Sequence, residues 1–558
     1  MVFLIPVLAF LAFLVFCALM TTGQPLNPTR PLMSYDQARE YAYRLQKMIC
    51  CKTISHKETY DDTEFAKLRM VMEELFPMVH KHCHRETFGD DCWVYVLPGQ
   101  KQDHNIMLMS HHDVVAAEGD WQHPPFSGEI AEGKIWGRGT VDTKTSLFAI
   151  FSALEELLAE GFVPECNLWI ASSHNEEVAG DGIPQVAQYF KEQGITFDFV
   201  LDEGGAVIDP PLSGMNCPKC AMVAIHEKGR CKLVLTAQEG SAHAGLTAGA
   251  KATPTERMAE FIAAFRKEDI FIRRMTPELE GMLKAMAPYM SYPMKIVFVN
   301  LWLFKPLLVK LMPKLSPAAA GLLGTTCAFN DLITEEGGKR CTARIMLRCI
   351  DDKDLEQDLK ALYALADKYG IIVTEGEREY HAPADPSLPP YGQISQCIRE
   401  VFPDVPVIPF ILPAGTDART LTDVCKCVLR FAPIRMSAQQ LASVHSENEN
   451  IDISAVGTAV VFYRRVLERY TSETVREEDE EEMEEEEIVE EQLPVPVVPE
   501  PEEIVSEAFF QELPDYPLEE TDDALLDMLL EPEAEPELSF EDISDDDFNM
   551  LSDWEETV

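Results

Sequence analysis

Short apolar runs alternate with longer amphipathic segments through the middle of the chain. The short runs have the length of buried strands, whereas apolar residues at every third or fourth position indicate helices. Residues 146–160 show the helical pattern clearly. Such alternation predicts an α/β domain. The predicted strands cover residues 105–109, 168–171, 197–201 and 405–412.

A polar cluster follows each of these four predicted strands directly. In chain order the clusters contain His111 and Asp113, then Glu176 and Glu177, then Asp202 and Glu203, then Thr416, Asp417 and Arg419. Open α/β sheets place their sites at the carboxyl ends of strands. We therefore expect these side chains to form one site.

A second unit, residues 229–382, interrupts the α/β pattern. Its predicted elements follow the order βαββαβ, which describes a small α+β sandwich inserted into the first domain. Residues 289–311 inside it are apolar but interrupted by prolines and lysines. A lid or substrate-facing surface is expected there, with a membrane span as the alternative. The first domain would thus comprise residues 34–228 and 383–470, ending in a helix over 456–470.

The amino terminus is a single apolar run. Residues 2–20 carry no charge, and 19 apolar residues nearly span a bilayer core of about 30 Å. No basic residue precedes the run, and Ala18-Leu19-Met20 is a poor cleavage triplet, so an uncleaved membrane anchor is favoured over a signal peptide for residues 1–22. We expect the enzyme on the extracytoplasmic side of a membrane, or secreted.

Charge is concentrated at the other end. The 558 residues include 95 acidic and 47 basic ones, a net charge of −48, and residues 477–558 hold 35 acids without Lys or Arg. This excludes nucleic acid as a partner, because no basic patch could neutralise phosphates. Residues 471–558 are predicted to be a disordered, solubilising tail; short helices that fold onto a basic partner are the alternative.

The polar clusters also predict a metal site. Imidazole and carboxylate ligands together suit Zn²⁺ or Mn²⁺. The candidate positions are His111 with Asp113, Asp142, Glu176 with Glu177, Asp202 with Glu203, and His445. One ion needs three or four ligands, so these five positions suggest two ions that share a bridging carboxylate. Asp142, after the glycines of loop 137–142, is the best bridging candidate. Glu176 and Glu177 cannot both face one ion from a regular strand, so one would bind metal and the other would act on water.

Six segments resemble the motifs of the acetylornithine deacetylase, aminoacylase and carboxypeptidase S family of two-zinc hydrolases. The first, Ser110-His111-His112-Asp113-Val114-Val115, resembles its His-x-Asp-Val-Val motif. The others are residues 128–144, 175–177, 201–204, 416–419 and 444–449, in the family's order and spacing over about residues 34–470. The chain looks most like the carboxypeptidase S and N-acyl-amino-acid hydrolase branch.

This resemblance implies a metal site with two Zn²⁺ ions per subunit. The implied zinc ligands are His111, Asp142, Glu177, Glu203 and His445, with Asp142 bridging. Asp113 would orient the His111 ring, and Glu176 would be the general base. Asp202, the neighbour of Glu203, stays open as the alternative ligand.

The resemblance also implies roles outside the metal site. The inserted unit would be a lid and homodimerisation domain, and His243 would reach the active site of the neighbouring subunit and steady the oxyanion. Arg419 would grip the substrate carboxylate, with Thr416 beside it in the same motif. Ala244-Gly245 stands where the family usually has Ser-Ser after the lid histidine.

The expected function is zinc-dependent hydrolysis of an amide. The substrate would be a peptide that loses its C-terminal residue, or an N-acyl amino acid that loses its acyl group. One alternative is an aminopeptidase of the same fold, which recognises a free amine. The other is a catalytically dead scaffold whose acidic tail recruits partners.

Overall fold

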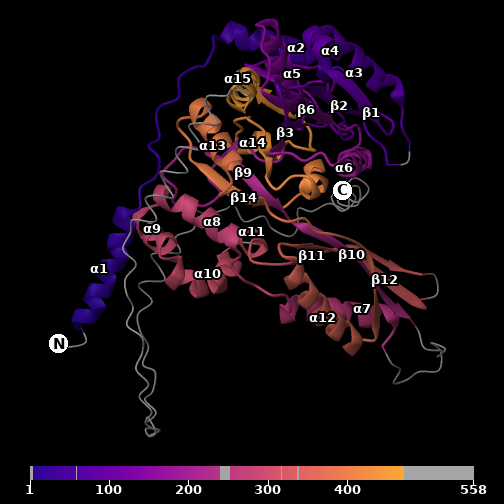
Figure 1. Ribbon diagram of the computed structural model, residues 1–558. Helices are drawn as coiled ribbons and strands as arrows, with labels where there is room; N and C mark the ends of the chain where they lie inside the picture. Colours follow the sequence, from indigo (N-terminus) through magenta and orange to yellow (C-terminus); the bar gives the residue numbers. More distant parts are fainter. Residues whose placement is uncertain (1–3, 58, 239–251, 316, 336–337, 471–558) are drawn as a thin grey trace, which may run out of the picture. The chain divides into compact units, whose positions relative to one another are not determined.

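The computed structural model describes residues 4–470 except 58, 239–251, 316 and 336–337 (Figure 1). The described residues belong to one compact unit. His243 and the acidic tail, residues 471–558, lie outside the described residues, so both expectations about them stay predictions.

A mixed nine-stranded sheet runs through the described chain, and together with its helices it confirms the α/β class. The spatial order is β1-β2-β6-β3-β7-β15-β9-β14, and β8 pairs with β9. The strands are β1 (His84–Phe88), β2 (Cys92–Leu97), β3 (Lys101–Met109), β6 (Cys166–Ser172), β7 (Phe199–Asp202), β8 (Val207–Ile208), β9 (Cys220–Glu227), β14 (Val407–Leu412) and β15 (Val428–Arg430).

Three of the four predicted strands lie side by side in parallel, but the fourth is reversed. β3 pairs in parallel with both β6 and β7, so the residues that follow these strands leave at one edge. β15 is parallel to β7, whereas β9 is antiparallel to β15, and β14 is parallel to β9. β14 therefore runs opposite to β3. An apolar run contains no information on strand direction, so the sequence does not predict this reversal.

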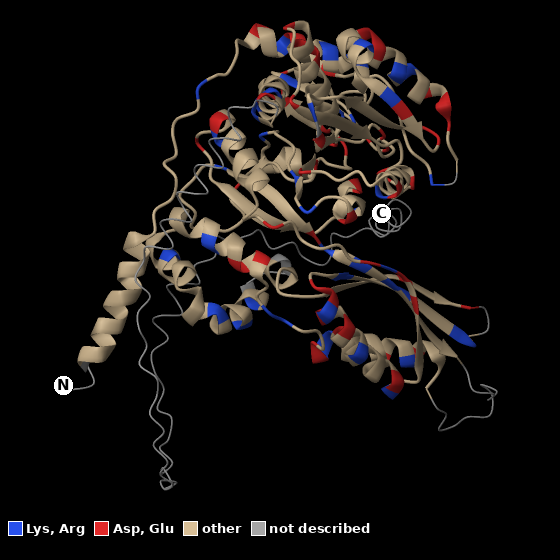
Figure 2. Ribbon diagram, viewed as in Figure 1, with Lys and Arg blue, Asp and Glu red and all other residues tan. Residues whose placement is uncertain are grey.

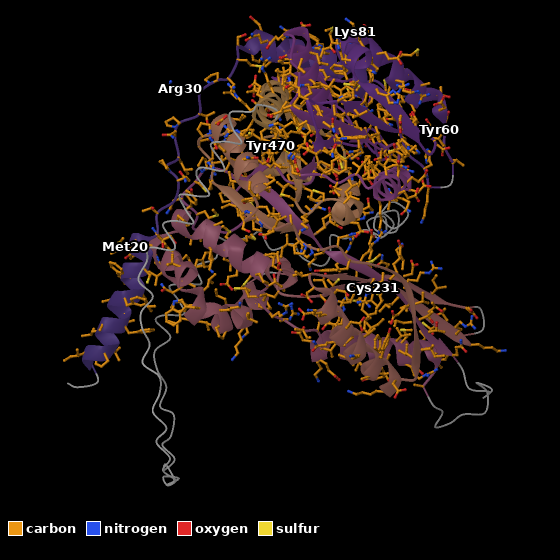
Figure 3. All side chains as sticks on the ribbon, in the orientation of Figure 1. Met20, Arg30, Tyr60, Lys81, Cys231 and Tyr470 are labelled. Carbon is orange, nitrogen blue, oxygen red and sulfur yellow. The ribbon has the colours of Figure 1, made fainter. Side chains whose placement is uncertain are left out.

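Helices pack around this sheet. Their amphipathic faces supply most of its core: Leu147, Phe151 and Leu154 of α5 are buried together with Val456 and Val460 of α15. The helices are α2 (Tyr35–Ile49), α3 (Asp62–Leu75), α4 (Pro77–His82), α5 (Lys144–Ala159), α6 (Gly182–Gln193), α13 (Pro389–Val401), the 3₁₀ helix η3 (Asp417–Asp423), α14 (Ala438–Ala442) and α15 (Ile453–Tyr470). Figure 3 labels Tyr470 at the end of α15.

A small three-stranded sheet joins two distant segments. Its order is β16-β5-β4, with β4 (Glu129–Ala131), β5 (Lys134–Trp136) and β16 (Asn450–Asp452). The antiparallel pairing of Asn450 with Trp136 brings the segment before β16 beside the loop after β5. Two of the six motifs therefore meet here.

The inserted unit has the predicted βαββαβ order. Its antiparallel sheet is ordered β11-β12-β10-β13, and the unit comprises β10 (Gly229–Gln238), α7 (Pro254–Glu268), β11 (Thr326–Thr334), β12 (Arg340–Cys349), α12 (Asp352–Lys368) and β13 (Ile371–Glu379). Alternate residues of β10 are buried against α7 and α12, as a one-sided sheet requires. The lid role itself is not evident from this packing.

The long piece between α7 and β11 packs on the main sheet. It contains α8 (Pro277–Met286), the 3₁₀ turn η2 (Ala287–Tyr289), α9 (Tyr292–Val299), α10 (Leu301–Leu315) and α11 (Pro317–Gly321). Leu279, Met282 and Met286 of α8 share one apolar cluster with Ile408 and Ile411 of β14. This piece thus packs on the main sheet, although it lies within the inserted sequence.

The amino-terminal apolar run forms helix α1 (Leu4–Met20). Within the described ranges, no helix taken alone has the length and apolar character needed to cross a membrane. Tyr292–Val299 and Leu301–Lys314 reach that length only as a pair, and the chain bends by 108° between them.

Candidate metal centre

Asp142 occupies a loop held by a buried glutamate. The Glu449 carboxylate accepts hydrogen bonds from the backbone N–H groups of Gly139, Val141 and Asp142, at 3.1, 2.7 and 3.1 Å. Arg138 adds a side-chain hydrogen bond to the same carboxylate at 2.7 Å. Both members of this ion pair are buried. The loop before α5 is thus fixed by the segment before β16, and this fixes the place of Asp142.

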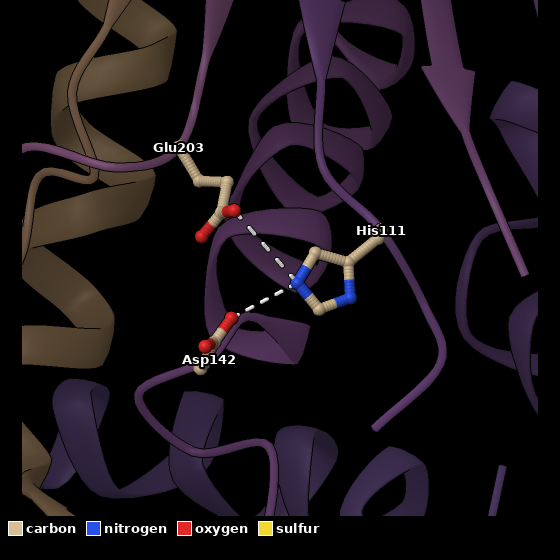
Figure 4. Close-up of side chains that lie close together, drawn as sticks. All are labelled: His111, Asp142 and Glu203. Atoms are coloured by element: carbon tan, nitrogen blue, oxygen red, sulfur yellow. Dashed lines mark hydrogen bonds and ion pairs between the residues drawn. The ribbon is translucent and has the colours of Figure 1, made fainter. Parts of the chain in front are cut away.

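Two histidines approach opposite oxygens of the Asp142 carboxylate. Nε2 of His111, after β3, lies 2.9 Å from Oδ1, and Nε2 of His445, after α14, lies 3.0 Å from Oδ2. Glu203 adds an oxygen 3.9 Å from Nε2 of His111 (Figure 4). Glu177 adds one 3.0 Å from Nε2 of His445. The result is two three-residue groups that share Asp142.

These two groups fit a pair of divalent cations. In each group the potential ligand atoms lie within 4.8 Å of one another. Imidazole nitrogen and carboxylate oxygen are the ligands that Zn²⁺ accepts. The second oxygen of Glu177 is buried and has no hydrogen bond to any described residue. A buried, unpaired carboxylate oxygen is costly unless a cation compensates it.

Asp113 orients the side chains around it. Its backbone oxygen lies 3.0 Å from Nδ1 of His111 and a carboxylate oxygen lies 3.3 Å away. When Nδ1–H donates to these acceptors, the lone pair of Nε2 faces Asp142, which is the orientation of a metal-ligating histidine. The same carboxylate accepts the backbone N–H groups of Glu176 and Glu177, at 3.2 and 3.1 Å. One buried group thereby places a histidine and both glutamates.

The charges at this site explain its pKa shifts. Burial disfavours the charged form of His111, but the carboxylates of Asp113 and Asp142 outweigh burial and raise its pKa well above the usual value. His445 responds in the same way, with a pKa raised to about 10. Burial and neighbouring carboxylates raise the pKa of Glu177 and Glu203. The site therefore concentrates negative charge that bound cations would neutralise.

The two adjacent glutamates point to different places. Glu177 reaches His445, whereas Glu176 lines a narrow crevice that also contains His111, Glu203 and Asp417. Burial raises the pKa of Glu176 well above its usual value, and nearby carboxylates add to the shift. Asp417 accepts a hydrogen bond from the hydroxyl of Ser173, and burial raises its pKa to about 7. Glu176 is therefore the glutamate that faces the crevice, and Glu177 is the one that joins a ligand group.

Asp202 and Glu203 also separate. Oδ2 of Asp202 accepts the backbone N–H of Ala418 at 3.1 Å, so this carboxylate holds the start of η3. Glu203 is the one that joins His111 and Asp142. The hydrogen bond from Ala418 to Asp202 also holds the residues that follow the reversed strand β14 beside the residues that follow β7.

Arg419 lies in η3, at the junction with the inserted unit. Its Nε donates to Glu379, the last residue of β13, at 3.0 Å, and its Nη1 donates to the backbone oxygen of Thr416 at 2.8 Å. Arg230 of β10 binds the other oxygen of Glu379 at 2.6 Å. These residues, except Thr416, line a cleft of about 660 Å³ that reaches from the inserted unit to the segment around His174.

Thr416 is less available to bind a substrate than its place in the motif suggests. Its backbone N–H and its hydroxyl both donate to Glu227, at 2.9 and 2.8 Å, and Arg430 pairs with the same buried carboxylate. Thr416 therefore fixes the loop beside Arg419 and has no hydroxyl proton left to donate to a ligand.

Sequence reasoning missed three residues near the site. Glu449 stands in the last motif, but only the fold shows that it holds Asp142. Glu379 and Arg348 lie in the inserted sheet, in positions without a motif signal. Arg348 pairs in register with Arg230, is half-buried, and makes no ion pair with any described residue. Burial, Arg230 and Arg419 lower the pKa of Arg348.

Comparison with known proteins places the chain among peptidases. The model of peptidase family M20/M25/M40 matches residues 107–469. A curated relative from Xenopus tropicalis, N-fatty-acyl-amino acid synthase/hydrolase PM20D1, is 27% identical and the match covers 79% of this chain and 88% of the relative. Probable carboxypeptidase S-like 2 from Dictyostelium discoideum is 29% identical, with 77% and 85% covered.

A solved structure shares the fold. An M20 family metallo-carboxypeptidase from Sulfolobus solfataricus superimposes with a TM-score of 0.57 at 17% identity, covering 77% of this chain and 99% of its own.

Proposed function

Since this chain belongs to peptidase family M20/M25/M40 and is an amide-bond hydrolase, we propose that it binds two Zn²⁺ ions and acts on substrates with a free carboxylate. This family membership confirms the resemblance found in the sequence. The amide would lie next to the C-terminal residue of a peptide, or join the acyl group of an N-acyl amino acid. The names of the relatives, a carboxypeptidase S-like protein and an N-fatty-acyl-amino acid hydrolase, support both substrate classes.

The observation that carries this proposal is the sharing of Asp142 by two ligand groups. His111 and Glu203 would complete one zinc site with it, and Glu177 and His445 the other. Such a bridged pair supplies Lewis-acid chemistry, which makes water acidic and polarises a carbonyl oxygen.

The chain's own residues would move the proton and place the substrate. Glu176 takes a proton from the attacking water and returns it to the leaving amine. Asp113 keeps His111 in the tautomer that presents Nε2. Arg419 grips the substrate carboxylate, because a guanidinium can donate two parallel hydrogen bonds to it. A substrate carboxylate would have to share or displace Glu379 there.

Product analysis tests the proposal. Purified protein, loaded with zinc, is given matched blocked dipeptides and N-acyl amino acids, each as the free acid and as the carboxyl amide. Release of amino acid from the free acids alone supports it. Hydrolysis of substrates with a free amine and an amidated carboxyl would favour an aminopeptidase, and no turnover in zinc-loaded protein would favour the scaffold.

The inserted unit is proposed as a lid and dimerisation domain, with His243 serving the neighbouring subunit's active site. Mixing two inactive variants tests this. Glu176→Gln subunits still carry His243, and His243→Ala subunits still carry Glu176. A mixed dimer would hold one complete site, so the mixture should recover activity that neither variant has. No recovery, from a protein that exchanges subunits, would contradict the shared site.

The amino-terminal segment is proposed as a membrane anchor that leaves the enzyme extracytoplasmic, with secretion after cleavage as the alternative. The exposed apolar side chains of α1 support this proposal. Sodium carbonate extraction of membranes, followed by amino-terminal sequencing, distinguishes a retained anchor from a removed signal.

A further inference from the structure

We propose that α9 and α10 form a second membrane-contacting surface, which lies in the headgroup region of an anionic lipid bilayer beside α1. This inference does not depend on the proposed hydrolase function. It concerns residues 292–314, far along the chain from the amino-terminal segment.

The first support is an exposed apolar stripe on α10. Trp302, Leu303, Leu307 and Leu311 are exposed large apolar residues, and Trp302 is 62% exposed. Leu303, Leu307 and Leu311 are spaced by four residues, which places them on one side of the helix, and Trp302 lies next to Leu303 at the edge of that side. The opposite side is packed inward, with Leu301 and Met312 in the apolar cluster beneath. An exposed apolar stripe on a helix whose opposite side is packed against the protein is typical of an interaction surface.

The second support is charge. Residues 281–330 contain five lysines and no Asp or Glu, in a chain whose net charge is −48. Figure 2 shows α9 and α10 with basic and no acidic residues. Lys284 and Lys305 pair with Glu280, whereas Lys295, Lys310 and Lys314 make no ion pair with a described residue. Lysines that flank an apolar stripe are suited to anionic headgroups, with their stems along the apolar surface.

The third support is continuity with α1. The ring of Phe10 meets that of Trp302 edge-on, with 6.2 Å between centroids, and Asn300 donates to the backbone oxygen of Leu14 at 3.2 Å. Leu14 and Ala18 are buried at this contact, while Leu11 and Phe13 face outward. The apolar surface of α1 thus continues onto α10.

The bend between the two helices favours a surface position. A turn of 108° between α9 and α10 does not suit a straight span, but it allows both helices to lie along an interface. Two other occupants are conceivable, a second copy of the chain and its own acidic tail. Neither accounts for the exposed side of α1, and three unpaired lysines are few for a tail with 35 acids.

Photolabelling from lipid tests the proposal with the full-length protein. The protein is reconstituted into phosphatidylcholine vesicles, with or without phosphatidylserine, that contain a phospholipid with a diazirine in its acyl chain. Trypsin cuts after Lys295 and Lys310, and the Lys305–Pro306 bond resists it, so residues 296–310 form one peptide. We expect label in this peptide as well as in the peptide that contains α1, and more label when phosphatidylserine is present.

Two variants and a matched control sharpen the test. Trp302→Glu with Leu307→Glu should cut the labelling of this region at least threefold and leave the α1 label unchanged. Lys310→Glu with Lys314→Glu should remove the gain from phosphatidylserine, since two lysines contribute about thirtyfold in affinity at an anionic surface. This variant is mapped with a protease other than trypsin. Met70→Glu with Val163→Glu, exposed apolar residues elsewhere, should change neither. All variants should hydrolyse a soluble substrate normally.

Several outcomes would overturn the proposal. One is an unlabelled 296–310 peptide in vesicles where α1 is labelled. Another is labelling of this peptide that changes neither with the glutamate substitutions nor with the phosphatidylserine content of the vesicles. A dimer in detergent that Trp302→Glu with Leu307→Glu dissociates would assign the surface to a second copy. Carbodiimide cross-links from Lys310 or Lys314 to residues 477–558 in vesicle-bound protein would assign it to the tail.

Discussion

The backbone N–H of Asp142 donates a 3.1 Å hydrogen bond to the carboxylate of Glu449, 307 residues further along the chain. Glu449 belongs to neither ligand group of the candidate metal centre, yet it holds the loop that places the shared ligand. The geometry of both proposed zinc sites therefore depends on a residue outside both ligand groups.

Glu449→Gln should weaken metal binding and stability together. The amide keeps the size of the side chain but removes the charge that Arg138 pairs with, and its NH₂ group would face an N–H donor. Breaking a buried ion pair costs about 3–5 kcal/mol. We expect a lower thermal unfolding midpoint and less bound zinc, measured by calorimetry and metal analysis. Glu447→Gln, two residues away and exposed, is the control and should retain both.

Glu176→Gln and Glu177→Gln should fail in different ways. Glu176 lines the crevice without joining a ligand group, so its variant should keep zinc and lose turnover by about 10²–10⁴-fold, the usual contribution of a general base. Glu177 contacts His445, so its variant should lose zinc. Metal analysis and steady-state kinetics are measured side by side. Zinc loss in the first variant with full zinc in the second would reverse the two assignments.

Arg419→Lys should affect binding of the substrate carboxylate. Lysine keeps the charge but lacks the planar fork that can bind a carboxylate twice. The Michaelis constant for free-acid substrates should rise strongly, with little change for their carboxyl amides. Arg344→Lys, at an exposed position of β12, should leave both unchanged. Equal losses on acids and amides would exclude this role.

The ion pairs of Glu379 should make stability depend on acid pH. His381, Arg419 and Arg230 hold its charged form and lower its pKa from 4.5 to about 2. A carboxyl with a depressed pKa stabilises the fold fully above its unfolded pKa and loses that contribution as pH falls toward the folded value. The stability advantage of the wild type over Glu379→Gln should therefore shrink as the pH falls from about 5 toward 3. Urea unfolding across this range measures it, and a difference that grows toward pH 3 would contradict the ion-pair account.

A chain ending at residue 476 should keep full turnover on small substrates. All six motifs lie before that point, and residues 477–558 contain 35 acids with no basic residue. Steady-state kinetics on the shortened and full-length proteins give the comparison. A normal unfolding midpoint together with lost activity would show that the tail takes part in catalysis.

The sequence predicts most of the metal centre because its ligands follow strands that are parallel and adjacent. His111, Glu177 and Glu203 follow β3, β6 and β7, and the alternation of these strands with helices predicts a parallel sheet whose carboxyl ends meet at one edge. Asp142 is predicted from the glycines that precede it in its loop. Gly137 and Gly139 both adopt positive φ, a conformation that other residues rarely adopt.

Other parts of the site could not be read from the sequence. The reversed direction of β14 changes how Arg419 reaches the cleft, and strand direction leaves no trace in an apolar run. The pairing of Glu379 with Arg419 links two units through single charged residues, which look like ordinary surface charges in a sequence. Which of Asp202 and Glu203 is the candidate metal ligand depends on a tertiary contact. The backbone N–H of Ala418 donates to Asp202, which leaves Glu203 to join His111 and Asp142.

The insertion of residues 229–382 between the two parts of the main sheet has a consequence for biosynthesis. Two parts of the first domain emerge from the ribosome only after the whole insertion. They are β15, which lies between β7 and β9, and Glu449, which holds the loop of Asp142. At about 5–20 residues per second, this leaves the first part of the domain incomplete for on the order of ten seconds. During that interval β7 has an open edge, and the acidic side chains of Asp142, Glu177 and Glu203 lack His445. Nascent chains of this protein should therefore depend on chaperones in this interval more than those of proteins with an uninterrupted sheet.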